Sequence, residues 1–240
     1  MFRQAQQPNF VKPNTIKMKL FLLTALFISQ SFVGFSQNYP YENHFNEAYQ
    51  LHPNIPKGVL EGIAWSYTRI THITADEVEG CSGIPHVYGV MGLTADGKGF
   101  FKNNLTKVSE LSGYPVDSIV LSPRINILAY AKAFDSLYYN FLQQNINNSK
   151  ANLGLFHTSL FPTMLRCKKV IFELSEIPDT GAVHIFARNS QVYQVMKFLQ
   201  DSQKQTEFNF PSYNIDLSLL FGAENLQILS ATRINLTENG

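Results

Sequence analysis

The stretch that decides the fold is residues 122–141, which read SPRINILAYAKAFDSLYYNF. Ser122 and Pro123 form a pair that starts many helices, because a serine hydroxyl can cap the free amide groups and proline fits the first turn. Apolar side chains then recur three and four positions apart, at Ile127, Leu128, Ala131, Phe134, Tyr138 and Phe141. This spacing places them on one face of a helix. The stretch therefore predicts a long helix that packs against a hydrophobic core.

Similar spacing on both sides of this stretch predicts further helices. They cover residues 56–67, 100–112, 115–120, 159–176 and 183–200. Gly113 is expected to end the second of them, and Pro115 to occupy the first turn of the third. The run LQIL at 226–229 favours a strand instead. The balance predicts an all-α or α-dominated domain, with few short strands at most.

The composition limits the classes of protein to consider. The chain has 240 residues, of which 45% are apolar and 15% charged, a balance that suits one domain with a real core and excludes global disorder. A net charge of +1 gives no electrostatic case for nucleic acid as a partner. The chain has neither a phosphate-binding loop motif nor the Gly-x-Ser-x-Gly motif of a nucleophilic serine, and we expect no cofactor.

The start of the chain has the features of an export signal. Lys17 and Lys19 precede an apolar run at 20–28. The run is too short for a membrane span, which takes about 20 residues. It fits the apolar region of a secretory signal peptide, so we expect a secreted or periplasmic protein whose mature chain has no stable membrane anchor.

The signal peptide sets the expected domain organisation. Small residues at Gly34 and Ser36 suit cleavage ahead of Gln37, and Met18 is a more natural start than Met1. The expected parts are a signal peptide at 1–36 with an extra stretch at 1–17, a helical domain at 37–205, and a C-terminal tail or linker at 206–240.

Cysteines and histidines give no strong site. Cys81 and Cys167 are the only cysteines, and after export they would either form one disulfide or remain two separate buried thiols. The six histidines lack the spacing of a zinc motif. His72, Asp76 and His86 could in principle converge, but they lack the spacing of metal ligands, and we expect no metal site.

Three segments, in order along the chain, resemble the goose-type lysozyme and soluble lytic transglycosylase family. They are VLEGIAWSYT at 59–68, GVMGLT at 89–94 and SPRINI at 122–127. The resemblance implies a lysozyme-like helical fold, with the 89–93 loop beside the helix that bears Tyr67. It also implies that peptidoglycan glycan strands are the partner. The substrate-binding residues expected from the resemblance and from aromatic contacts with sugars are Tyr67, Tyr88, Gly89, Met91, Gly92, Leu93, Asn126 and Tyr130.

The segments depart from the family at the catalytic position. Tyr67 stands where the family has its catalytic glutamate, and Thr68 replaces the serine that follows. A phenol with a reference pKa of about 10 is a poor proton donor compared with a carboxylic acid of tuned pKa. Glu77 and Glu79 lie in the loop between the first two segments and are candidates for a relocated acid, although charged loop residues are usually simply exposed. Glu61, on the same helix as Tyr67, reads as a surface charge.

A narrower resemblance covers residues 81–93 and 96–98. These residues look like the N-terminal region of large secreted N-acetylmuramoyl-L-alanine amidases from Bacteroidetes-type bacteria, and residues 221–240 are similar to the stretch leading towards their zinc amidase domain. The amidase motif and its zinc ligands do not occur in these 240 residues.

Three functions remain open at this stage. The first is a pseudoenzyme module that binds glycan strands without cleaving them. The second is an active peptidoglycan glycosidase or lytic transglycosylase that uses Glu77 or Glu79. The third is a folding or docking region that touches no sugar, which a filled cleft would favour.

Overall fold

The computed structural model describes residues 39–74, 85–96, 99–148 and 160–234. The chain divides into two units, Met1–Gln37 and Asn38–Gly240, and the described residues all belong to the second. The expected signal peptide and its cleavage point lie outside the described residues. So do Asp76, Glu77, Glu79 and Cys81.

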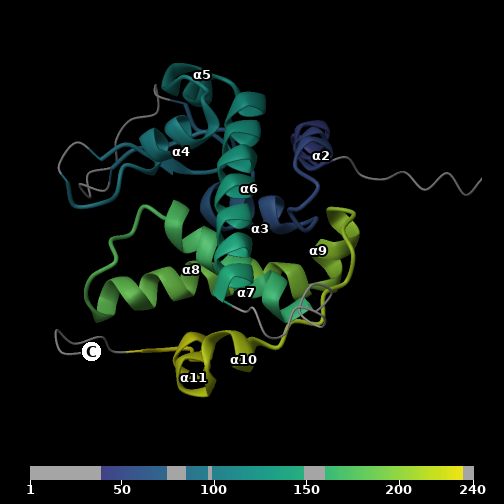
Figure 1. Cartoon of the computed structure of the whole chain (residues 1–240), viewed down its shortest axis with the longest axis vertical. Helices are drawn as coiled ribbons and strands as arrows, with labels where there is room; N and C mark the ends of the chain where they lie inside the picture. The colour runs from purple at the N-terminus through teal and green to yellow at the C-terminus, as the bar shows by residue number, and fades with distance from the viewer. Residues whose placement is uncertain (1–38, 75–84, 97–98, 149–159, 235–240) are drawn as a thin grey trace, which may run out of the picture. The chain divides into compact units, whose positions relative to one another are not determined.

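The described residues form an all-α fold, as predicted (Figure 1). The helices are α2 (Glu42–Leu51), α3 (Val59–Thr68), α4 (Asn104–Ser112), α5 (Val116–Leu121), α6 (Pro123–Asn148), α7 (Leu160–Leu174), α8 (Ala182–Gln200), α9 (Ser202–Glu207), α10 (Leu217–Phe221) and α11 (Ala223–Ser230). Two short strands, β1 (Val87–Tyr88) and β2 (Leu93–Thr94), pair antiparallel, with Val87 opposite Thr94 and Tyr88 opposite Leu93.

The predicted long helix is the centre of the fold. Helix α6 has 26 residues, and the Ser122 hydroxyl accepts a hydrogen bond from the Ile125 amide (3.3 Å), which is the expected cap. Five of the six predicted core residues on α6 are buried, and Phe141 packs against the core from its edge. Helix α6 contacts α2, α4, α5 and α7 (Figure 1), so it joins the early and late parts of this unit.

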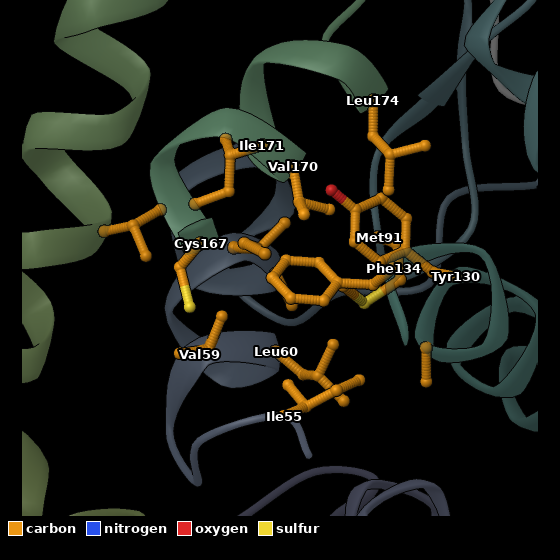
Figure 2. Packing of buried hydrophobic residues seen from close by; sticks show 14 of the residues in the cluster. Ile55, Val59, Leu60, Met91, Tyr130, Phe134, Cys167, Val170, Ile171 and Leu174 are labelled. Atoms are coloured by element: carbon orange, nitrogen blue, oxygen red, sulfur yellow. The ribbon is translucent and has the colours of Figure 1, made fainter. Parts of the chain in front are cut away.

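Side chains from elements far apart in sequence meet at the middle of α6. Figure 2 shows the Phe134 ring among Leu60 of α3, Met91 of the loop between the strands, and Val170 of α7. All four side chains are at most 1% exposed. Burial of this apolar surface is the main term that holds the helices together.

Two local predictions are corrected by the structure. The segment at 226–229 is helical within α11, because Leu226 and Leu229 lie three positions apart and both pack against the core. Pro115 is the residue before α5 rather than its first residue, with an extended backbone at φ −62° and ψ 143°.

Residues after 205 belong to the same packed unit as the helices and do not form a loose tail in their described part. Phe208 and Phe210 are buried against Phe198 of α8, with ring centroids 5.2 Å and 5.5 Å away. Trp65 of α3 meets Phe208 edge-on, with centroids 5.9 Å apart. Ile215, Leu220 and Phe221 add further buried surface. This aromatic cluster fixes the C-terminal segment to α3 and α8.

Glu61 is a buried residue of the core and not the surface charge that the sequence indicated. Its side chain is 3% exposed, and its two carboxyl oxygens accept hydrogen bonds from the hydroxyls of Tyr39 (2.8 Å) and Tyr49 (2.5 Å). The Tyr49 hydroxyl also accepts a hydrogen bond from the Leu60 amide (3.1 Å). The residues before and within α2 are therefore tied to α3 through one carboxyl group.

Candidate functional site

The 89–93 loop lies directly beside the C-terminal end of α3, as the family resemblance predicted. The Thr68 hydroxyl donates a hydrogen bond to the Val90 carbonyl (2.6 Å). A Cβ atom added to Gly92 would stand 2.6 Å from Cβ of Tyr67, so the loop backbone touches the tyrosine. Only glycine allows so close an approach, and Gly92 also has a positive φ of 66°.

Asn126 of α6 holds the same loop through its side-chain amide. Its Oδ1 atom accepts a hydrogen bond from the Met91 amide (2.8 Å), and its Nδ2 group donates to the Ile119 carbonyl (3.1 Å). The backbone of Gly89 packs against the amide group so tightly that a Cβ atom there would lie 1.9 Å from Nδ2. A fully buried asparagine therefore fixes the loop to α6.

Most of the predicted substrate-binding side chains are not at a surface. Met91, Leu93, Asn126 and Tyr130 are 1%, 0%, 0% and 3% exposed, so they shape the site from within the core and cannot contact a glycan in this conformation. The two loop glycines are buried as well. Tyr88 is half-buried beside the His86 ring, with centroids 4.6 Å apart. Among the predicted residues, Tyr67 lines an open hollow.

This hollow has a volume of about 510 Å³ and lies between the end of α3, the turn after α7, and α8. Its walls include Tyr67, Glu176, Phe186, Ser190, Gln191 and Gln194. The wall is mostly apolar, with a few amide and hydroxyl groups and one carboxyl group set in it. Such a mixture is typical of pockets that orient a small polar ligand.

Glu176 is the residue of this site that the sequence did not reveal. Its Oε1 atom accepts a hydrogen bond from the Gln191 side chain (2.7 Å), whereas its buried Oε2 atom makes no hydrogen bond of normal geometry. Burial raises the pKa of Glu176, and the neighbouring Gln191 amide and Tyr67 hydroxyl offset only part of that rise. The group is therefore protonated over a wider pH range than an ordinary glutamate.

The turn that carries Glu176 is held from several sides. Lys102 donates its backbone amide to the Glu176 carbonyl (2.6 Å), and Asn104 donates its side-chain amide to the Leu174 carbonyl (2.9 Å). The carbonyls of residues 172 and 173 accept hydrogen bonds from Arg188 of α8 and Lys107 of α4. Because four neighbouring carbonyls are anchored in this way, the carboxyl group has a fixed place next to Tyr67.

Tyr67 itself is a neutral hydrogen-bonding group at ordinary pH. Burial and the nearby Glu176 and Tyr130 raise the pKa of its hydroxyl well above the ordinary value. The phenol therefore neither ionises nor acts as an acid of tuned strength. In the sequence, Glu176 stands in the run LSEIP at the end of a predicted helix. Only its contact with Tyr67 in the folded chain distinguishes it from an exposed glutamate at a helix end.

Other kinds of site find no support in the part of the chain that the structure describes. There, no three His, Cys, Asp or Glu side chains come together as metal ligands, and no helix is both long and apolar enough to cross a membrane. Cys167 is buried and forms no disulfide within the described residues, which do not include Cys81, and burial raises the pKa of its thiol to about 12. Comparison of the chain with protein-family models, with curated proteins and with solved structures gives no match.

Proposed function

We propose that the chain is a peptidoglycan-directed, lysozyme-like module that binds glycan strands in the hollow beside Tyr67. We further propose that it is the N-terminal region of a secreted N-acetylmuramoyl-L-alanine amidase. The observation that carries the first proposal is the contact of the 89–93 loop with the end of α3 at Tyr67. This is the arrangement that the three family-like segments imply, and an open hollow adjoins it.

The chemistry of the hollow supports binding in preference to cleavage at Tyr67. Sugar rings present hydroxyl groups along their edges and C–H groups on their faces. Gln194 offers an amide donor and acceptor, and Phe186 offers an apolar ring. Each such contact contributes about 1 kcal/mol, so a single site would bind weakly and gain from tethering to a second domain.

The first prediction concerns binding to insoluble peptidoglycan. We expect purified protein to pellet with it, and Ala187→Trp to weaken this binding about tenfold, because the indole would fill the hollow. Ile185→Trp is the matched control, since Ile185 lies on the same helix, is 51% exposed and does not line the hollow. Equal pelleting of the two variants, or no pelleting of the wild type, would contradict the proposal.

A second candidate, glycosidic cleavage, is favoured by the position of Glu176 in the wall beside Tyr67, whereas Glu77 and Glu79 lie outside the described residues. The protonated carboxyl of Glu176 could transfer a proton to the glycosidic oxygen as the bond from that oxygen to the sugar C1 breaks, with water or the C6 hydroxyl of the same sugar adding to C1 and losing a proton. The same assay distinguishes the candidates, because binding alone releases no muropeptides. Release that Glu176→Gln abolishes would establish cleavage, and absence of both pelleting and release would leave only a docking role.

A further inference from the structure

A second hollow, of about 370 Å³, adjoins the first along α3 and α8. The two share Ser66 and Gln194 in their walls, so they are neighbours on the surface. The second hollow differs in charge, because its walls include Arg69, Lys197 and Lys204 around Trp65.

Two of these cations are available to a ligand. Lys204 is the exception, because its Nζ atom pairs with the Glu207 carboxylate (2.7 Å). Among the described residues, no carboxylate pairs with Arg69 or Lys197. Asp201, the acidic residue in the wall, instead accepts hydrogen bonds from the first amides of α9.

Arg69 lies in the wall of this hollow and has a strained backbone. Arg69 and Ile70 both adopt the left-handed conformation, at φ 55° and 60°. Glycine is the usual residue at such a helix end, and a β-branched residue there is a genuine outlier. The Arg69 guanidinium donates to the Trp65 carbonyl and stands 5.4 Å from the Trp65 ring centroid, in the wall of the hollow. Strain of this kind persists where the surroundings impose it and often marks a binding site.

We propose that this second hollow binds a carboxylate carried by the glycan strand, through Arg69 and Lys197. The proposal rests on the proposed function, because it names which chemical group of peptidoglycan occupies the space next to the first hollow. The planar guanidinium of Arg69 matches the two oxygens of a carboxylate. In peptidoglycan, the lactyl carboxylate of the muramic sugar is free only where no stem peptide is attached, because the peptide is joined to it as an amide. Where a stem peptide is present, the carboxylates are those of the peptide.

The test compares charged and neutral versions of one ligand by calorimetry or NMR titration. The probes are the disaccharide of N-acetylglucosamine and N-acetylmuramic acid, its lactyl methyl ester, the same disaccharide carrying a stem dipeptide, and diacetylchitobiose. We expect the free acid or the dipeptide form to bind roughly 3- to 10-fold more tightly than the ester, as for a partly exposed charge pair. The form with the larger gain identifies the source of the carboxylate.

Variants separate recognition of the charge from folding. Arg69→Gln combined with Lys197→Gln should reduce the ratio of the affinities for the acid and the ester to about one. Lys132→Gln should preserve this ratio, because Lys132 is an exposed cation on α6 that lies near Tyr114. Arg69→Gly should lower the preference while leaving the melting temperature equal or higher, because glycine relieves the left-handed strain.

The outcomes are distinct for the two proposals. Equal binding of acid, dipeptide and ester forms by the wild type, together with binding of diacetylchitobiose, would overturn the carboxylate site and leave the proposed function standing. A preference that survives the double substitution would also overturn it. Failure of all four probes to bind would refute the proposed function and this inference together.

Discussion

Gly89→Ala is expected to lower the free energy of unfolding by about 3–5 kcal/mol, a large effect for a single methyl group. The new Cβ atom would stand 1.9 Å from Nδ2 and 2.2 Å from Cγ of Asn126, which is completely buried. Asn126 would have to move and lose its hydrogen bonds to the Met91 amide and the Ile119 carbonyl. Each buried group left without a partner costs about 1–3 kcal/mol, and the φ of +74° adds backbone strain.

Gly113→Ala provides the matched control for this experiment. Gly113 has the same φ of +74°, but an added Cβ atom there would meet nothing within 4 Å. Its substitution should cost only the conformational term, about 1 kcal/mol. Denaturant unfolding of both variants therefore isolates the collision with Asn126. Equal losses of stability would show that the loop is not fixed in the way described.

The helices could be predicted from the sequence because their evidence is local. The stripe on α6 and the Ser122–Pro123 start are spacing and capping signals, and both reappear in the structure. The prediction of a strand at 226–229 was wrong, because the β-propensity of four residues is weak compared with the packing of Leu226 and Leu229 on the core. Where the local propensity is this weak, tertiary contacts decide the secondary structure of the segment.

The site was only partly predictable, because its charged member comes from a distant element. The contact of the 89–93 loop with Tyr67 followed from the family-like segments. The pairing of Tyr67 with Glu176 depends on how the turn after α7 meets α3, and no spacing rule links residues that far apart. The same holds for Glu61, whose burial depends on hydroxyl groups of Tyr39 and Tyr49 from another part of the chain.

Glu61 is the second position at which we expect a large effect. Glu61→Ala should lower the free energy of unfolding by about 2–4 kcal/mol, because it opens a cavity and leaves the buried hydroxyls of Tyr39 and Tyr49 without an acceptor. Glu61→Gln keeps the shape and one acceptor oxygen, so its loss should stay within about 1 kcal/mol at acidic pH. Chemical denaturation of the three proteins provides the comparison.

The pH dependence of these variants tests whether the Glu61 carboxyl is protonated. Burial raises the pKa of Glu61 above its ordinary value near 4.5, in spite of the two tyrosine hydroxyls. The folded state therefore binds the proton more tightly than the unfolded state, and this contribution to stability is complete below pH 4.5 and lost as the pH rises through the raised pKa. Glutamine does not titrate, so the difference in unfolding free energy between Glu61→Gln and wild type should move in favour of the variant as the pH rises. A difference that stays constant from pH 4 to 8, measured at about one-unit steps, would mean that Glu61 has the same pKa in the folded and unfolded chains.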